Sequence, residues 1–205
     1  MNKELVDNNH ILLKNLIPKD RALKLSQEFI DFDKEWNYPT DDILKQVMKS
    51  DKNTAASLYN PVGAVELLCE LTPKITSIVE ETVVPSYSFG RIYRNGDFLP
   101  THVDRPACEL SLTLHLHGDH LWEFEIETPR EEVVAYELNP GDAVLYLGPI
   151  APHSRATKFK GTYYSQFFLH YVRSRGLYAN AVFDSMTVEK DDDELKREYK
   201  ELYGN

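Results

Sequence analysis

Cysteine is scarce in this chain, which has two among its 205 residues, Cys69 and Cys108. The two lie far apart and at no spacing typical of metal ligands, so the sequence excludes a cysteine-based metal motif. Free thiols in an intracellular protein are the favoured interpretation, with a single disulfide as the alternative.

Long apolar segments are missing as well. No run of apolar residues approaches the ~18 that a membrane-spanning helix requires. The stretch from Met1 to Asn15 carries charge throughout and lacks the apolar core of a signal peptide. We therefore expect a cytoplasmic protein that has no membrane partner.

Positive charge is in deficit. The 23 lysines and arginines stand against 33 acidic residues, which gives a net charge of -10 and a pI near 5.2. This balance argues against a nucleic acid as partner, because phosphates attract basic surfaces. Three residues considered below, His102, Asp104 and His153, nevertheless have arginines close to them along the chain, which leaves room for an anionic ligand there. These arginines are Arg91, Arg94, Arg105 and Arg155.

The composition that remains is that of a globular protein, 42% hydrophobic and 11% aromatic, at a length that suits one domain. The first 84 residues read as helical. Apolar stripes and capping signals predict helices from Pro18 to Trp36, from Asp41 to Met48, and from Asn60-Pro61 to Val79, the last kinked or split by Pro73. The charged segment 191–203 predicts a short amphipathic helix.

From Pro85 onward the hydrophobic period changes to that of strands. Short apolar and aromatic runs alternate with turns rich in Gly, Asn and Pro, which favours a jelly roll or barrel over a parallel sheet. We predict one α+β, mainly β domain over residues 1–205, with helical support in 1–84, a jelly-roll core in 85–175 and a C-terminal extension in 176–205. The predicted strands are 86–94, 109–116, 121–126, 133–138, 143–147 and 163–172.

His102, Asp104 and His153 form the most informative set of residues. Residues two apart on a strand face the same way, so His102 and Asp104 can bind one metal from a single strand end. His153 follows a Pro-Gly-Asp turn and an apolar strand, and it supplies a third ligand from a distant part of the chain. Two imidazoles and one carboxylate occupy one face of an octahedron and leave three positions open, as in non-haem Fe(II) oxygenases.

A second histidine set competes for this role. His115-x-His117, with His120 and Glu123 or Glu125 nearby, has the spacing of cupin metal sites. Both histidines are out of phase with the leucines of the same strand, which places them on its other face. A cupin-like metal-binding protein without oxygenase activity, a substrate-facing role and plain solvent exposure all remain open for them.

The segments Phe89–Leu116 and Pro140–Tyr171 resemble the core of the iron(II)/2-oxoglutarate-dependent oxygenases, in particular the prolyl 4-hydroxylase-like branch. The resemblance covers roughly half of the chain. It implies a double-stranded β-helix, which is a jelly roll, with the N-terminal helices packed on one sheet and Fe(II) held by His102, Asp104 and His153. The motifs that carry it are Arg91-Ile-Tyr93-Arg-Asn-Gly96, His102-Val-Asp104, Pro140-Gly-Asp142, Pro152-His153 and Gln166-Phe-Phe-Leu-His-Tyr171.

The resemblance further implies O2 and 2-oxoglutarate as co-substrates, the latter bound at two of the open metal positions. The far carboxylate of 2-oxoglutarate needs a cation in a dry pocket. The basic residue that family members usually carry on the last core strand is replaced here by Thr162 and Tyr163. We expect Arg155 to take this role instead, ahead of Lys158 and Lys160.

Further roles follow from the same resemblance. Tyr93, Tyr164 and Gln166 are expected to help bind the co-substrate. Phe168 is expected to pack the barrel interior, and Arg105 to reach the substrate or to form a surface ion pair.

In this family O2 and 2-oxoglutarate are converted to CO2 and succinate while an unactivated C–H bond is hydroxylated. We expect an Fe(II)- and 2-oxoglutarate-dependent dioxygenase that acts on a prolyl or other side chain of a protein or peptide. The alternative is the same chemistry on a small molecule such as a free amino acid. The oligomeric state stays open, with a dimer as one option.

Overall fold

Two antiparallel sheets face each other in the computed structural model, which describes residues 1–36 and 56–184. The larger sheet contains His10–Leu13 (β1), Ala56–Tyr59 (β2), Val83–Arg94 (β3), Leu110–Gly118 (β5), Ala143–Tyr146 (β8) and Tyr163–Arg173 (β10), in the order β1-β8-β5-β10-β3-β2. The smaller sheet contains Leu99–His102 (β4), Glu123–Glu127 (β6), Val133–Glu137 (β7) and His153–Arg155 (β9), in the order β4-β9-β6-β7. The predicted mainly β jelly roll is therefore confirmed.

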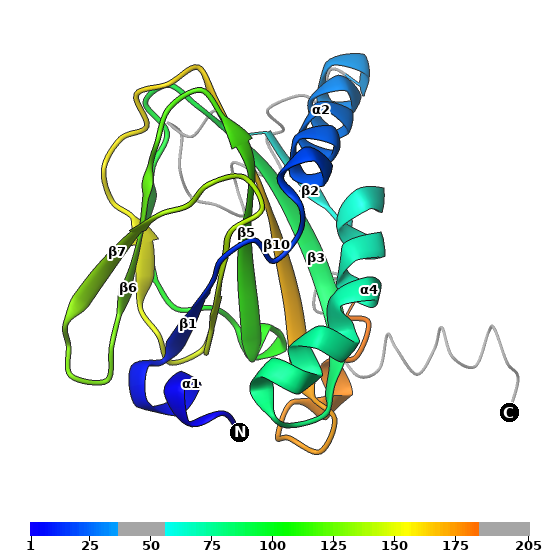
Figure 1. Ribbon diagram of the computed structural model, residues 1–205, viewed down its shortest axis with the longest axis vertical. Helices are drawn as coiled ribbons and strands as arrows, with labels where there is room; N and C mark the ends of the chain where they lie inside the picture. Colours follow the sequence, from blue (N-terminus) through cyan, green and yellow to red (C-terminus); the bar gives the residue numbers. More distant parts are fainter. Residues whose placement is uncertain (37–55, 185–205) are drawn as a thin grey trace, which may run out of the picture.

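The helices of the described residues pack on the larger sheet. The helices are Lys3–Asn8 (α1), Lys19–Trp36 (α2) and Val62–Val79 (α4), with short 3-10 turns at Pro106–Cys108 and Ala179–Ala181. Figure 1 shows α2 and α4 lying against the outer face of the larger sheet, while β6 and β7 stand on the opposite side of the molecule. The smaller sheet thus closes over the inner face of the larger one.

Strand β5 shows how the sequence builds both layers. Its leucines at alternate positions are fully buried in one cluster with residues of α2 and α4, since alternate side chains of a strand face one side. Burial of each such leucine contributes about 1.5–3 kcal/mol. The intervening residues Ser111, Thr113 and His115 are buried too, and they face the smaller sheet. The inner face is therefore polar and dry, as a binding site requires.

The prediction that residues 1–84 are helical is wrong in part, because β1 and β2 lie within them. Strand β1 pairs with β8, with His10 opposite Tyr146, and β2 pairs with β3. Both strands are four residues long, too short for their alternation to stand out between helices. Pairing with a neighbouring strand, and not local propensity, decides their conformation.

The helix predicted from Asn60-Pro61 exists, with one difference in its cap, and of the two effects predicted for Pro73 the kink is the one observed. Asn60 does not cap it, because the Asn60 side chain accepts hydrogen bonds from the Ser88 backbone NH and hydroxyl, at 2.8 and 3.2 Å. Pro73 does not split it, since α4 runs through Pro73 to Val79. Figure 1 shows the helix bending along its length, as expected where proline removes a backbone hydrogen bond.

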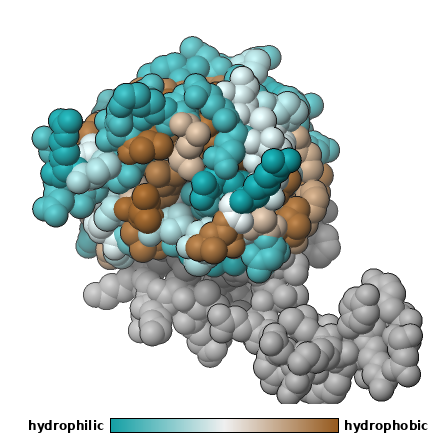
Figure 2. Space-filling model, turned by 90° about the horizontal axis from the view of Figure 1, so that it is seen from below, coloured by the Kyte–Doolittle hydropathy of each residue, from teal (hydrophilic) through white to brown (hydrophobic). Residues whose placement is uncertain are grey.

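Two predicted helices, Asp41 to Met48 and 191–203, lie outside the described residues. Among the described helices, none has the length and apolar character to cross a membrane. Figure 2 shows hydrophobic residues in several separate patches on the face it draws, interrupted by hydrophilic ones. The large apolar residues that are exposed, such as Val6, Leu121 and Leu177, belong to different parts of the fold.

Candidate metal and co-substrate site

Strand pairing between β4 and β9 brings the predicted metal ligands together. His102 ends β4, His153 begins β9, and the two are register partners across the strands. Asp104 lies two residues beyond β4, and its backbone NH donates to the Gly148 carbonyl at 2.9 Å. Two segments about fifty residues apart in sequence therefore meet at one end of the smaller sheet.

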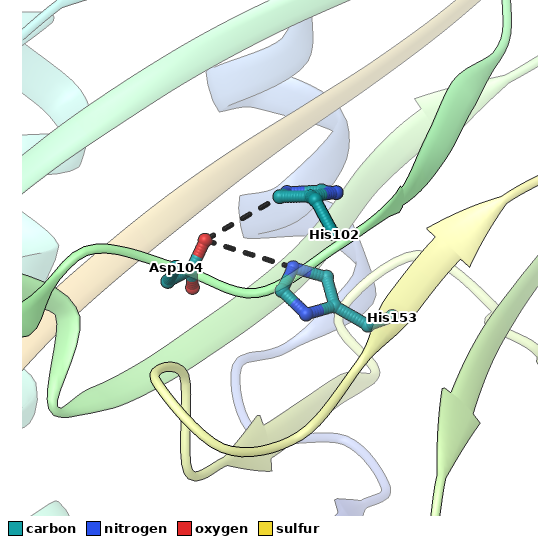
Figure 3. Close-up of side chains that lie close together, drawn as sticks. All are labelled: His102, Asp104 and His153. Carbon is teal, nitrogen blue, oxygen red and sulfur yellow. Dashed lines mark ion pairs between the residues drawn. The ribbon is translucent and has the colours of Figure 1, made fainter.

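Figure 3 shows both imidazoles and the carboxylate turned toward one another. Asp104 Oδ1 lies 3.8 Å from His102 Nε2 and 3.7 Å from His153 Nε2. The two imidazole centroids are 4.3 Å apart. Adjacent ligands of an octahedral metal with bonds of about 2.1 Å lie roughly 3 Å apart, so the two distances from Asp104 Oδ1 each exceed that spacing by less than ~1 Å.

Backbone carbonyls fix which nitrogen of each histidine carries the proton. His102 Nδ1 lies 2.8 Å from the Pro100 carbonyl, and His153 Nδ1 lies 2.9 Å from the Ala151 carbonyl. A carbonyl only accepts, so each Nδ1 carries the hydrogen and each Nε2 presents a lone pair. Both lone pairs face Asp104 Oδ1. Metal ligands are commonly oriented by this kind of hydrogen bond.

The three side chains of the site differ in exposure. The side chain of His102 is 38% exposed, that of Asp104 14% and that of His153 2%. Burial lowers the pKa of His153 and the neighbouring His102 adds to this, whereas Asp104 and the Ala151 carbonyl oppose it. The net lowering keeps His153 neutral, which is the form that binds a metal.

Residues that the sequence analysis missed surround Asp104. The Ser111 hydroxyl lies 2.6 Å from Asp104 Oδ2 and 3.0 Å from His170 Nδ1. Asp104, Cys108 and His170 together form a second group close enough to hold a metal. Desolvation lowers the pKa of His170 to about 4 and raises that of Cys108 to about 12. No spacing pattern predicts this group, because it depends on how β5 and β10 pair.

Tyr146 was also missed. Its hydroxyl lies 3.3 Å from His153 Nε2, beside the face where the three ligand atoms converge. Complete burial raises the pKa of Tyr146 well above its ordinary value, with Asp104 adding to the effect, so the hydroxyl keeps its proton. Alternation along the strand Ala143–Tyr146 places the Tyr146 side chain inside the barrel. The metal-ligand motif gave no reason to single out this tyrosine.

Arg155 lies on the same strand as His153, two residues further on, with no exposed surface. Its guanidinium donates to the Trp122 carbonyl at 2.6 Å, to Tyr164 Oη at 3.1 Å and to Gln166 Oε1 at 2.9 Å. It also lies over the rings of Trp122 and Tyr164, 4.9 and 4.6 Å from their centroids. Its Nε has no hydrogen-bond partner among the residues that the structure describes. Three of the predicted co-substrate residues thus lie together.

The remaining predicted residues have the following surroundings. Tyr93 is buried in an aromatic cluster with Trp122, Phe159 and Tyr164 and accepts from Arg91 at 3.3 Å. Phe168 is half-buried, 6.1 Å from Phe89 between ring centroids. Lys158 and Lys160 are exposed, which disfavours them as buried anchors. Of the two roles considered for Arg105, the structure has the ion pair, with Asp184.

The rival histidine set does not form a metal group within the described residues. His115 faces the inner side of the larger sheet and stacks on Tyr164 at 4.2 Å between centroids. Burial, with a contribution from Arg155, lowers the pKa of His115 to about 3. His117 contacts the Tyr163 hydroxyl, and His120 is exposed. The expectation that these residues lie on the other face of the strand holds, but His115 is buried.

Comparison with known proteins identifies the fold. No family model and no curated protein matches the sequence. Among solved structures, a prolyl-4-hydroxylase from Pseudomonas putida is similar over 84% of this chain and 96% of that protein, with a TM-score of 0.65 and 16% identity. The fold is therefore one that prolyl-4-hydroxylases use.

Two further solved structures have a similar fold. HygX from Streptomyces hygroscopicus, solved with nickel and 2-oxoglutarate bound, matches over 85% of this chain and 88% of its own, with a TM-score of 0.60 and 8% identity. The α-ketoglutarate-dependent epimerase SnoN matches over 83% and 78%, with a TM-score of 0.60 and 7% identity. These likenesses establish the jelly-roll fold of 2-oxoglutarate and iron enzymes.

Proposed function

We propose that this protein is an Fe(II)- and 2-oxoglutarate-dependent dioxygenase that hydroxylates an unactivated C–H bond. The observation that carries the proposal is the convergence of His102 Nε2, His153 Nε2 and Asp104 Oδ1 on one point, in a fold shared with enzymes of this class. The ligand set is two neutral nitrogens and one carboxylate oxygen. Such a set suits iron and leaves three positions for other ligands.

The second part of the site fits a dicarboxylate co-substrate. A guanidinium that is wholly buried, as Arg155 is, is costly unless an anion accompanies it. Within residues 1–36 and 56–184, its hydrogen bonds go to neutral acceptors and its Nε has no partner. The Cα atoms of residues two apart on a strand are ~6.6 Å apart. The backbone positions of His153 and Arg155 are therefore separated by about the length of a five-carbon dicarboxylic acid.

Within this proposal each side chain has a defined task. His102, Asp104 and His153 hold the iron, which when loaded with its co-substrates supplies the oxidising chemistry. Arg155 binds the far carboxylate of 2-oxoglutarate, with Tyr164 and Gln166 orienting the guanidinium and Tyr93 lining the same pocket. The aromatic walls around Arg155 exclude water and strengthen its attraction for an anion.

For the substrate we propose a prolyl or other side chain of a protein or peptide, by analogy with the Pseudomonas putida prolyl-4-hydroxylase. The small-molecule alternative is favoured by HygX, which was also solved with hygromycin B bound. Fold and metal do not determine the target of an enzyme. The exposed side of His102 is where either kind of substrate reaches the metal.

The metal centre is tested by measuring Mn2+ binding to the wild type and to two variants. Asp104→Ala removes the only anionic ligand, and we expect its Mn2+ affinity to fall below detection, with 2-oxoglutarate turnover lost. His117→Ala is the matched control, because a cupin-like site would need it, and we expect wild-type binding. Loss of binding in His117→Ala with retention in Asp104→Ala would overturn the proposal.

The substrate class is tested by supplying Fe(II), 2-oxoglutarate and O2 with proline-containing peptides or with free amino acids, and measuring the succinate released above the level without substrate. We expect peptides to stimulate succinate formation and the peptide to gain one oxygen atom by mass. Stimulation by free amino acids alone would end the peptide proposal and establish the alternative.

A further inference from the structure

The two carboxylate oxygens of Asp104 have different partners. Oδ1 faces both ligand nitrogens, at 3.7 and 3.8 Å, whereas Oδ2 is 2.6 Å from the Ser111 hydroxyl. We infer that Ser111 and His170 are positioning residues that lock Asp104 into binding the metal through Oδ1 alone. This inference rests on the proposed function, since it assumes that the triad binds a metal.

Hydrogen-bond chemistry fixes the direction of the chain. An ionised carboxylate only accepts, so the single proton of the Ser111 hydroxyl points to Asp104 Oδ2. The Cys108 carbonyl is a weaker competitor, because it is neutral and lies 3.2 Å away. Toward His170 the Ser111 oxygen can then only accept a hydrogen bond. His170 Nδ1, 3.0 Å away, must therefore be the donor. The chain runs from His170 through Ser111 to Asp104.

The surroundings hold each member in place. His170 is 5% exposed, and its ring packs on Tyr87 with the centroids 4.4 Å apart. Ser111 is fully buried on β5. Gly148 supplies the room, because a Cβ there would lie 2.9 Å from both Asp104 Oδ2 and Ser111 Oγ and 2.2 Å from the Cys108 carbonyl oxygen. The hydroxyl and the carboxylate meet only because residue 148 has no side chain.

Binding of Asp104 through Oδ1 alone determines how many metal positions stay open. A carboxylate that binds through both oxygens occupies two positions and leaves two, whereas chelation by a keto acid plus O2 needs three. Occupying Oδ2 with a charge-assisted hydrogen bond disfavours the second mode. The same hydrogen bonds also explain why Asp104, Cys108 and His170 lie close together without a second metal. The Ser111 hydroxyl already joins Asp104 to His170.

The first test compares Ser111→Ala with Ser165→Ala by Mn2+ titration and by thermal unfolding without metal. Ser165 is also a fully buried hydroxyl, but it hydrogen-bonds Ser26 and the His117 carbonyl on the helix side of the sheet. We expect Ser111→Ala to bind Mn2+ about 10- to 100-fold more weakly, and Ser165→Ala to bind as wild type. Equal Mn2+ affinity of Ser111→Ala and wild type would overturn the inference that Ser111 positions Asp104.

The second test separates the donor from the ring at position 170. His170→Phe keeps a ring against Tyr87 but has no N–H, whereas His170→Asn keeps a donor near Nδ1 but no ring. We expect weakened Mn2+ binding in His170→Phe and near wild-type binding in His170→Asn. The reverse pattern would mean that packing alone is important. In a Ser111→Ala background, His170→Phe should weaken binding no further.

These outcomes are distinct from failure of the proposed function. If wild type itself binds no divalent cation, the proposed function fails. If wild type binds tightly and Ser111→Ala and His170→Phe bind equally well, only the lock fails. Co2+ titration adds a spectroscopic readout: we expect weak visible bands without a thiolate charge-transfer band. A thiolate band that disappears in Cys108→Ser would instead establish the second group as a metal site.

Discussion

At the scale of single residues, Arg155 has the most unusual environment. Its guanidinium is removed from water and surrounded by aromatic rings. Within the described part of the chain its hydrogen bonds reach a carbonyl, a phenol and an amide. Among these described residues no carboxylate hydrogen-bonds the guanidinium to offset its charge. A bound anion is the physical reason we give for retaining such a residue.

Arg155→Gln should consequently weaken 2-oxoglutarate binding to the Mn2+-loaded protein. Loss of hydrogen bonds to a charged group costs about 1.5–3 kcal/mol, which is ~10- to 150-fold in the dissociation constant. Isothermal titration measures it. The exposed Lys158 and Lys160 provide the control, and their joint replacement by Ala should leave the affinity unchanged. If that double variant loses binding and Arg155→Gln does not, the anchor is wrongly assigned.

His115 gives a prediction about pH. Its pKa is about 3 in the folded protein against an ordinary value of 6.5, because burial disfavours the charged form. The unfolded state takes up the proton first, so the stability that neutral His115 provides is complete above pH 6.5 and is lost as the pH falls toward 3. The slope is about 1.4 kcal/mol per pH unit.

His115→Phe keeps a ring for the stack on Tyr164 and removes the titration. Urea unfolding at several pH values between 6.5 and 4 should show a flatter decline in stability for this variant than for wild type. His120, which is exposed, serves as the control, and His120→Asn should follow the wild-type curve. Parallel curves for His115→Phe and wild type would show that His115 does not titrate as described.

At the scale of elements, the short strands β4 and β9 position the proposed metal ligands His102 and His153, and the sequence predicts neither strand. They are four and three residues long, and their alternation cannot be distinguished from a loop. The residue types and their spacing nevertheless singled out His102, Asp104 and His153 as a candidate metal site, and the structure brings the three together. This pattern depends on a few chemically distinctive residues and not on the alternation that a short strand lacks.

The turn between β8 and β9 gives the prediction at this scale. Gly148→Ala places a Cβ 2.2 Å from the Cys108 carbonyl oxygen and 2.9 Å from both Asp104 Oδ2 and Ser111 Oγ. We expect a loss of stability of about 1–3 kcal/mol together with weaker Mn2+ binding. Gly96→Ala is the comparison: its φ of +89° makes alanine strained, but nothing lies within 4 Å. It should lose about 1–2 kcal/mol with metal binding intact.

At the scale of the whole molecule, the change from a helical period to a strand period at Pro85 predicted the jelly roll and its helical cover. Six predicted strands exist with ends shifted by a few residues. The parts that were not predictable depend on pairing: β1 and β2 become strands because β8 and β3 offer edges. Likewise Ser111 and His170 meet only through the register of β5 with β10, which no local pattern contains.

A metal that binds only the folded state must stabilise the whole molecule. At a concentration 100 times its dissociation constant, Mn2+ should add about 2.7 kcal/mol to the free energy of unfolding. Thermal unfolding with and without Mn2+ measures the shift for wild type. Asp104→Ala should show no shift, and His117→Ala should show the full one. A shift of the same size in Asp104→Ala would place the cation elsewhere.

The most direct test of the metal centre is a crystal structure of the protein with Mn2+ and 2-oxoglutarate, grown without O2. The account predicts one Mn2+ bonded to His102 Nε2, His153 Nε2 and a single oxygen of Asp104, with the far carboxylate of 2-oxoglutarate on Arg155. Mn2+ bound at His115 and His117, or at Cys108 and His170, with the triad left apart, would contradict it.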